Sequence, residues 1–236
     1  MSLLLLVDAS VQGIAIAFSN VKAAGKSSIV WSKVLSSVGD SATNLPLAYQ
    51  QGLTELGRSP SDVVGMVASI GPGSFTGIRV GLAYMLGLNC GAGDNLSPKW
   101  LGVSTLDLVA DEYSKSMGCD FYLCLPSTRT TGYTAGVLGG KFLFSESFDL
   151  RDFASDKYKS LPGVCFIVGA WQELTSKLPP KTKVELIPVD LFLTKSLEAM
   201  AKKATAVWPT GFSKVPPEPR YLKQSSVEEN AKGVSP

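Results

Sequence analysis

The chain has 236 residues, of which 45% are hydrophobic and 18% are charged, and its formal net charge is +2. This is the composition of a folded globular protein with enough chain for one large domain or two lobes, and it lacks the strongly basic field that marks many nucleic-acid binders. The chain contains no histidine. This absence excludes Ser-His-Asp and Cys-His catalysis, and the zinc sites of H-E-x-x-H peptidases, within this chain.

The first ten residues, MSLLLLVDAS, contain an apolar run of five residues that is followed at once by Asp8. A secretory signal has a longer apolar region behind a basic segment, so we expect none here. No stretch reaches the eighteen or so apolar residues of a membrane span. The four cysteines form no C-x-x-C pair, so we expect small buried thiols and not a zinc or dithiol site. These features predict a cytoplasmic protein with no membrane segment.

The first half of the chain alternates between short apolar runs and helical patterns. The expected strands, of which the first two form a hairpin, are 3–7, 13–18, 28–35 and 63–70. The expected helices are 43–58 and 75–89. Apolar residues at helical spacing predict the first of these helices, namely Leu45, Tyr49, Leu53 and Leu56. Pro46 suits its first turn, and Ser74 suits the N-cap of the second helix.

The order β-β-β-α-β-α in this half is that of a ribonuclease H-like lobe, and the second half repeats it loosely. A helix capped by Ser104 or Thr105 is expected at 102–115, and a late helix at 192–204. The remaining expected strands are 121–125, 132–138, 141–148 and 164–169. Gly139 and Gly140 are expected to close a hairpin between two of them.

We therefore predict an α/β fold of two ribonuclease H-like, actin-like (ASKHA) lobes, each a mixed sheet with flanking helices. The predicted N-terminal lobe is 1–103 and the predicted C-terminal lobe is 104–225. The proline-rich, polar segment from Val215 onward is expected to run extended over the surface, with 226–236 as a flexible tail.

The segment SIGPGSFTGIR (69–79) places glycines between a predicted strand and a predicted helix. It lacks the lysine of a phosphate-binding P-loop, and its glycine spacing is one residue too long for a dinucleotide fingerprint. Pro72 stands where a nucleophile elbow requires glycine. Two interpretations remain open. Either Gly71, Gly73 and Ser74 hold an anion at the helix N-terminus, or the glycines only permit an unusual backbone and the serine only caps the helix.

The helix that follows contains glycines at intervals that need an explanation. Gly77 and Gly81 lie four residues apart, and Ala83 and Gly87 repeat that interval. Each glycine inside a helix costs roughly 1 kcal/mol relative to alanine. We expect the compensation to be close approach of another backbone, either the sheet beneath or a partner helix.

The segment SIGPGSFTGIRVGLAYMLGL resembles the signature of the TsaB (YeaZ) family, and the resemblance extends to LLLLVDASVQGIAIAF, GVSTLDLVAD and EPRYLKQ. It implies a two-lobed ASKHA fold and a role in making threonylcarbamoyladenosine beside the anticodon of ANN-decoding tRNAs. In that family this subunit is not the catalyst. It pairs with the related subunit TsaD, which holds metal through histidines, and works with the ATPase TsaE; homodimers also occur.

For this chain, the resemblance implies no catalytic residue and no metal ligand, with ATP or ADP bound only at the level of the complex and tRNA contacted indirectly. The region that corresponds to the TsaD metal motif, GVSTLDLVADEY, has no histidine, and Asp107 and Asp111 are typical of a solvated helix face. The chain also departs from its family. A histidine common in relatives is missing near Asp40, and the segment PSTR keeps Arg129 but has Ser127 in place of an acid.

The two helices at 43–57 and 75–89 are expected to form the docking face for TsaD, as half of a four-helix seam. The predicted partner-binding residues are Leu45, Leu47, Ala48, Gly77, Arg79, Val80, Ala83 and Tyr84.

The alternative is an ATP-binding phosphotransferase of the actin or sugar-kinase type, in which Asp8 would help to position metal and phosphate. A cluster of basic residues late in the chain either contacts tRNA phosphates or forms a solvated surface. Its members are Lys195, Lys202, Lys203, Lys214, Arg220 and Lys223.

Overall fold

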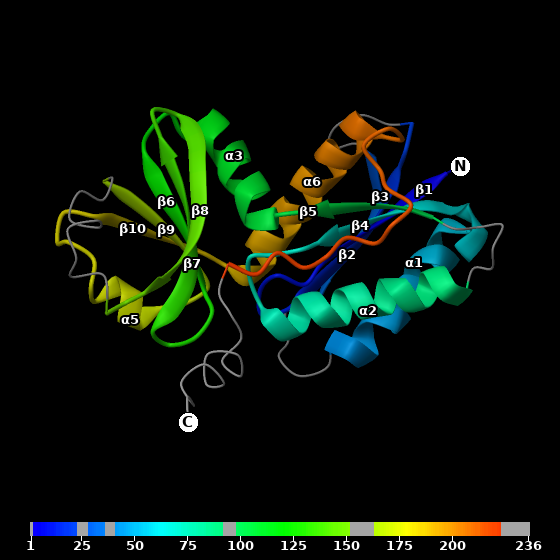
Figure 1. The fold of residues 1–236 in the computed structure, drawn as a ribbon, viewed down its shortest axis with the longest axis horizontal. Coiled ribbons are helices and arrows are strands. Elements are labelled where there is room, and N and C mark those ends of the chain that lie inside the picture. Colours follow the sequence, from blue (N-terminus) through cyan, green and yellow to red (C-terminus); the bar gives the residue numbers. More distant parts are fainter. Residues whose placement is uncertain (1, 23–27, 36–40, 92–97, 152–162, 223–236) are drawn as a thin grey trace, which may run out of the picture.

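The computed structural model describes residues 2–22, 28–35, 41–91, 98–151 and 163–222. They form two five-stranded sheets that lie side by side along the long axis of the molecule (Figure 1). The strands of the first sheet are β1 (Leu3–Asp8), β2 (Ile14–Asn20), β3 (Ile29–Leu35), β4 (Val63–Ser69) and β5 (Lys99–Val103). Those of the second are β6 (Phe121–Pro126), β7 (Thr131–Leu138), β8 (Lys141–Asp149), β9 (Val164–Val168) and β10 (Lys183–Ile187).

Both sheets have the same topology, which confirms the predicted fold class. The strand orders are β3-β2-β1-β4-β5 and β8-β7-β6-β9-β10. In each sheet the first three strands are an antiparallel meander, and the last two run parallel to the first strand. Because a parallel connection needs a crossover, each half has to follow its meander with crossover segments. The first sheet uses helices for both crossovers.

Helices cover both faces of the first sheet. Helices α1 (Ser41–Leu56) and α2 (Phe75–Gly91) lie on one side, and α6 (Val189–Val207) lies on the other (Figure 1). The leucine run of β1 is divided between these layers, because successive side chains of a strand point to opposite faces. Leu3 and Leu5 pack with the core of α1 and α2, whereas Leu4 and Leu6 pack with the core that includes α6. All six residues of β1 are buried.

The remaining described helices connect or flank the second sheet. Helix α3 (Thr105–Met117) packs on β6, β7 and β8 and also on α6, so that α3 and α6 meet between the two sheets. Short elements occur at η2 (Pro60–Asp62) and α5 (Gln172–Thr175). In the described part of the chain, no helix combines the length and hydrophobicity that a membrane crossing requires.

Several predicted boundaries need correction. Residues 102 and 103 belong to β5, a strand that the sequence analysis missed together with β10, and α3 begins only at Thr105 with Ser104 as its N-cap. Pro46 lies in the second turn of α1, because this helix begins at Ser41. The hairpin is confirmed, since Gly139 and Gly140 both have positive φ between β7 and β8.

The predicted boundary at residue 103 is also the end of β5. Some residues after this boundary nevertheless pack on the first sheet and not on the second. Helix α6 packs on β1, β2 and β3, and the segment after it returns along the first sheet. There, Trp100 and Ser213 exchange backbone hydrogen bonds of 2.7 and 2.8 Å, and the Arg220 amide donates to the Ile70 carbonyl. The segment 214–222 is extended, as expected, whereas the predicted tail 226–236 lies outside the described residues.

The expectation of buried cysteines is confirmed for two of the four. Cys124 and Cys165 are buried on neighbouring strands with their sulfur atoms 3.8 Å apart. Cys90, in the last turn of α2, is exposed, and Cys119 is half-buried. Cys90 is exposed because it continues the outward-facing stripe of α2, one turn beyond Leu86.

Candidate functional site

The glycine-rich loop between β4 and α2 seats the start of the helix against the β1–β2 turn. The Ser74 amide donates a 2.7 Å hydrogen bond to the Ser10 carbonyl, and the Ser74 hydroxyl accepts one from the Gly77 amide at 3.1 Å. The predicted N-cap is therefore confirmed. A Cβ atom on Gly73 would lie 2.0 Å from the Ser10 carbonyl oxygen, and one on Gly77 would lie 2.3 Å from the Ala9 carbonyl oxygen. These two glycines permit close contact between backbones of the same chain.

The β1–β2 turn is itself fixed by buried polar contacts. The Asp8 side chain is fully buried, and its Oδ1 atom accepts a hydrogen bond of 2.9 Å from the Ser10 amide. The Ala9 amide donates to the Ser69 hydroxyl, and the Thr105 hydroxyl donates to the Ser10 hydroxyl. The Oδ2 atom of Asp8 has no hydrogen-bond partner among the described residues. The Asp8 carboxylate is therefore enclosed by its own turn, and its predicted contact with a nucleotide or anion stays a prediction.

Two spaces in the protein are large enough for a small ligand, with volumes of about 520 and 710 Å³. The space of 710 Å³ is lined by residues of both lobes. This interlobe cavity is lined by the β1–β2 turn (10–12), the start of α2 (74–76), the β6–β7 turn (126–129) and the segment after β9 (168–173). These segments follow the carboxyl ends of parallel strands in both sheets, which is where open α/β sheets bind ligands. Its lining combines apolar residues with five hydroxyl-bearing residues, and Arg129 and Glu173 are its charged residues.

The sequence predictions for this region are resolved in different ways. Of the four residues proposed for a nucleotide or anion, only Ser74 lines the interlobe cavity. Gly71 and Gly73 are buried inside the loop, where Gly71 faces the Arg220 carbonyl. Anion binding by this loop stays a prediction. Glu173 was not predicted as a site residue. Its position just after the predicted strand 164–169 could have indicated that it lies at the cavity.

The floor of the cavity in the second lobe is set by Trp171. Its indole N–H donates a 2.9 Å hydrogen bond to the Arg129 carbonyl, and the ring is buried. A Cβ atom on Gly132 would lie 2.3 Å from this ring, so the indole lies directly on the backbone of β7. The segment PSTR is therefore held from beneath, whereas the Arg129 side chain is exposed.

The predicted docking residues separate into three groups. Leu47, Arg79 and Ala83 are exposed, and Gly77, Val80 and Tyr84 are half-buried. Leu45 and Ala48 are buried at 0% and 1% exposure in the core beneath α1, so their expected outward orientation is wrong. They share the inward face of α1 with Tyr49 and Leu53, which follow at intervals of four residues.

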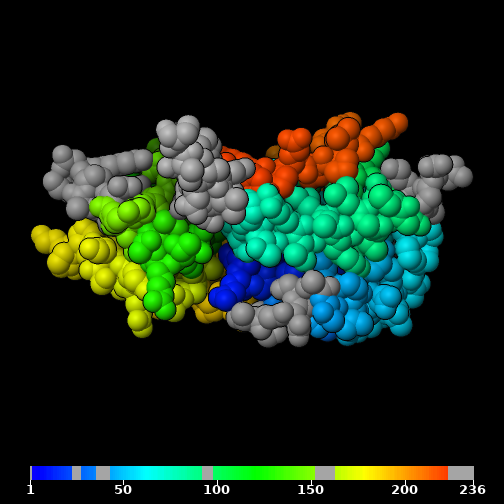
Figure 2. Space-filling view, turned by 60° about the horizontal axis from the view of Figure 1, so that its bottom comes forward, coloured from blue at the N-terminus to red at the C-terminus, as the bar shows by residue number. Residues whose placement is uncertain are grey.

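The outward side of the helix pair has few charged groups. We define the α1–α2 face as Leu47 of α1 together with six residues of α2, namely Thr76, Arg79, Val80, Ala83, Leu86 and Gly87. Helix α1 also exposes the polar residues Gln50, Gln51, Thr54 and Glu55. Arg79 is the one charged residue in the sequence of α2, and Glu55 is the one in α1. Figure 2 looks onto this side and shows α2 as a band between the C-terminal segment and α1. A helix on a protein surface normally carries polar and charged residues outward, so the outward side of α2 is unusually poor in charge.

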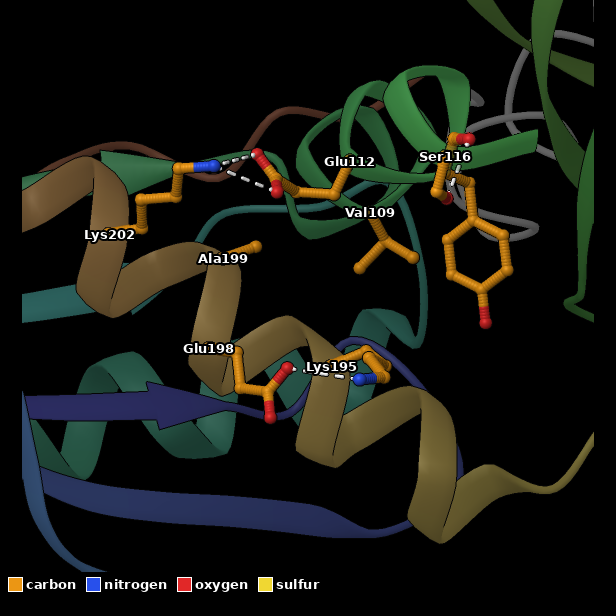
Figure 3. A pocket seen from close by; sticks show the side chains of 8 residues that line it. Val109, Glu112, Ser116, Lys195, Glu198, Ala199 and Lys202 are labelled. Carbon is orange, nitrogen blue, oxygen red and sulfur yellow. Dashed lines mark hydrogen bonds and ion pairs between the residues drawn. The ribbon is translucent and has the colours of Figure 1, made fainter. Parts of the chain in front are cut away.

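The second space, of about 520 Å³, is a groove between α3 and α6 (Figure 3). Its rim is made of ion pairs. The Lys202 ammonium lies 2.9 Å from each Glu112 carboxylate oxygen, and Lys195 pairs with Glu198 at 3.1 Å. The floor is apolar, with Val109 and Ala199 facing each other across the groove.

These contacts bear on the predicted basic cluster. Lys195, Lys202 and Arg220 are neutralised by acidic residues of the same chain, and Lys223 lies outside the described residues. Arg220 pairs with Asp107 at 2.7 Å. Asp111 pairs with Lys115 at 2.5 Å. The described residues contain no group of three or more acidic or cysteine side chains that could hold a metal ion.

The ion pairs of Glu112 predict a small loss of stability in acid. Burial alone would raise the pKa of Glu112, but hydrogen bonds from Lys202 and Lys115 outweigh it and lower the pKa below the ordinary value of 4.5. A lowered folded-state pKa stabilises the protein above pH 4.5, and this contribution is lost as the pH falls through the folded-state value. Because the pair is partly exposed, we expect less than about 1 kcal/mol.

Urea unfolding at pH 7 and pH 3 measures this contribution. Glu112→Gln should lower the free energy of unfolding at pH 7 and should have a smaller effect at pH 3, because the contribution of the ion pair declines as the pH falls through the lowered pKa of Glu112. High salt should reduce the difference at pH 7. An equal effect of the substitution at both pH values would contradict an electrostatic role for Glu112.

Similarity to known proteins is found only at the level of structure. No family model matches the chain, and no curated protein matches it. The solved structure of YeaZ from Pseudomonas aeruginosa is similar at 20% identity with a TM-score of 0.62, over 88% of this chain and 94% of that one. A second structure, of an uncharacterized protein with similarity to peptidase YEAZ from Pseudomonas aeruginosa, is similar at 19% identity with a TM-score of 0.61. That match covers 94% of this chain and all of the other. At this identity the likeness shows a shared fold, as the resemblance predicted.

Proposed function

We propose that this chain, with the fold of YeaZ, is a TsaB-type scaffold subunit that pairs with a TsaD-type catalytic subunit. The pair would form threonylcarbamoyladenosine beside the anticodon of ANN-decoding tRNAs, in the cytoplasm. The observation that carries this proposal is the α1–α2 face, a large outward surface with a single charge on α2. Leu47 is 59% exposed and Leu86 is 37% exposed on this surface.

The α1–α2 face suits a pair of helices from a partner. Two antiparallel or crossed helices pack closely when small residues let the backbones approach, and Ala83 and Gly87 supply that surface on α2. A partner of related fold would present its own helix pair and complete a four-helix seam. The core of such an interface is apolar and its rim polar, which matches the exposed apolar residues here.

The absence of histidine supports a proposal in which the partner performs the chemistry. TsaD would contribute the metal and the transfer of the threonylcarbamoyl group, and TsaE would contribute ATP hydrolysis. This chain would contribute shape, with nucleotide bound at the level of the complex and tRNA contacted indirectly. The internal neutralisation of Lys195, Lys202 and Arg220 supports an indirect contact with tRNA.

Reconstitution of the modification tests this function. TsaD and TsaE from the same organism, the enzyme that supplies threonylcarbamoyl-adenylate, and an ANN-decoding tRNA are incubated with and without this chain. We expect modified nucleoside, measured by mass spectrometry of digested tRNA, only when this chain is present. Equal yields with and without it would refute the scaffold role.

The interlobe cavity favours one alternative, an ATP-binding phosphotransferase. The hydroxyl groups in its lining and the side chain of Arg129 could contact phosphate groups. Against it, Asp8 is enclosed, and Glu173 is the one carboxylate that lines this cavity. Calorimetric titration of the isolated chain with Mg-ATP separates the two functions. Micromolar binding would favour the phosphotransferase, and we expect no binding of that strength.

A further inference from the structure

We propose that α2 presents two fixed recognition points, the guanidinium of Arg79 and an apolar cavity beside Gly87. Together they fit a partner helix that carries a carboxylate and a bulky apolar side chain, in preference to a second copy of this chain. The inference rests on the proposed function, because it names the chemistry that the TsaD-type partner must bring to the α1–α2 face.

The first recognition point is held in place by two aromatic side chains. The Arg79 guanidinium carbon lies 3.7 Å from the centroid of the Phe75 ring, and its Nε donates a 3.0 Å hydrogen bond to the Tyr221 hydroxyl. The two rings pack against each other at 5.0 Å. The terminal nitrogens of Arg79 have no partner among the described residues, and the side chain is exposed. A guanidinium with one edge bound and one edge free is preorganised for a carboxylate.

The second recognition point lies at the other end of α2. A cavity of about 230 Å³ is walled by Tyr49, Val63, Met66, Leu88 and two prolines, and Gly87 and Gly91 lie at its edge. A Cβ atom on Gly87 would meet nothing within 4 Å. This helical glycine therefore has no packing reason within the described chain, unlike Gly77. An apolar pocket of this kind accepts an aliphatic or aromatic anchor, the usual centre of an interface.

The spacing of the two points defines the partner segment. Arg79 and Gly87 are eight residues apart, which is about 12 Å along a helix. Both are on the exposed side of α2. A helix that crosses α2 at a shallow angle would meet both points with side chains about two turns apart. A segment with one acidic and one large apolar residue at that interval fits the face.

A second copy of this chain fits less well. In a two-fold dimer the same face meets itself, so each Arg79 would need a carboxylate from the α1–α2 face of the other copy. The one acid of the two helices is Glu55, which already accepts hydrogen bonds from the Trp31 indole at 2.7 Å and from Gln51 at 2.6 Å. Self-association would therefore bury two guanidinium groups without partners, which is unfavourable.

Binding to TsaD from the same organism, measured by calorimetry with full-length proteins, tests the two points. Arg79→Gln should weaken pairing at least about 30-fold, and Arg79→Glu more. Gly87→Leu, which places a bulky side chain at the edge of the cavity, should weaken pairing about tenfold or more. Lys203→Glu, a charge reversal on the opposite side of the first sheet, is the control and should have no effect. Replacing one acid of the TsaD docking helices by arginine should restore binding to Arg79→Glu.

The outcomes separate this inference from the proposed function. If the wild-type chain does not bind TsaD, the proposed function fails. If it binds, and Arg79→Gln and Gly87→Leu bind within threefold of wild type, the function stands and this inference is overturned. Wild-type self-association as tight as pairing, measured by sedimentation, would also overturn it.

Discussion

Alanine at Gly77 is expected to destabilise the protein by about 2 kcal/mol, whereas alanine at Gly87 in the same helix is expected to stabilise it by about 1 kcal/mol. At Gly77 the new methyl group would lie 2.3 Å from the Ala9 carbonyl oxygen, which belongs to the backbone and cannot rotate away. The resulting displacement of α2 outweighs the better helix propensity of alanine. At Gly87 the methyl group meets open space, so only the propensity gain remains.

Gly73→Ala should destabilise the protein more than Gly77→Ala does, because its Cβ would lie 2.0 Å from the Ser10 carbonyl oxygen and its φ of 157° is rare for residues with side chains. Urea unfolding followed by tryptophan fluorescence measures the three variants against wild type. If Gly77→Ala and Gly87→Ala shift the free energy of unfolding in the same direction, the close contact between the β1–β2 turn and α2 is not what requires glycine at position 77.

These glycines also show how far sequence reasoning reaches. The interval of four between Gly77 and Gly81 is visible in the sequence, and it predicted a close approach of backbones. The sequence does not say what approaches. The neighbour of Gly77 is the Ala9 carbonyl, 68 positions away in the chain, and only the folded pairing of β1 with β4 brings the two together. A local pattern predicts that a contact exists, whereas the topology determines its partner.

The elements themselves follow the strength of their local patterns. The leucine run of β1 and the periodic helices were predicted within a few residues, since both have clear apolar periods. β5 and β10 were missed because they are five-residue strands with charged residues at their first positions, Lys99 and Lys183. The orientation of Leu45 was predicted wrongly for a different reason. Helical spacing defines a face but does not say whether a sheet or a partner covers it.

The candidate site was harder to predict than the fold. The interlobe cavity is lined by four segments of the chain, and up to about 60 positions lie between one segment and the next. No sequence motif links Glu173 to Ser74. The α1–α2 face is different, because most of its residues belong to a single helix. The scarcity of charge on α2 can be seen in its sequence alone, so the outward position of Arg79 and Ala83 was predicted without the structure, whereas their role in docking stays a prediction.

Glutamate at Ala83 is expected to weaken pairing with the TsaD-type subunit at least 100-fold while leaving the melting temperature of the isolated chain unchanged. Ala83 is exposed on the outward side of α2, and glutamate has nearly the helix propensity of alanine, so the fold tolerates it. In the paired state its carboxylate would be removed from water, and a loss of about 3 kcal/mol corresponds to roughly 100-fold in affinity.

Because position 83 is one helical turn after Arg79, the new carboxylate would also compete with the partner for this guanidinium. Ala206→Glu makes the same change at an exposed position of α6, on the opposite side of the first sheet, and serves as the matched control. Co-purification of each variant with tagged TsaD, together with thermal unfolding of each variant alone, makes the comparison. We expect Ala206→Glu to co-purify like wild type and Ala83→Glu to be lost. Undiminished co-purification of Ala83→Glu, with normal melting of both variants, would place the interface on another surface, because at the centre of an apolar helix seam the new carboxylate would either be buried or take Arg79 from the partner, and both weaken pairing.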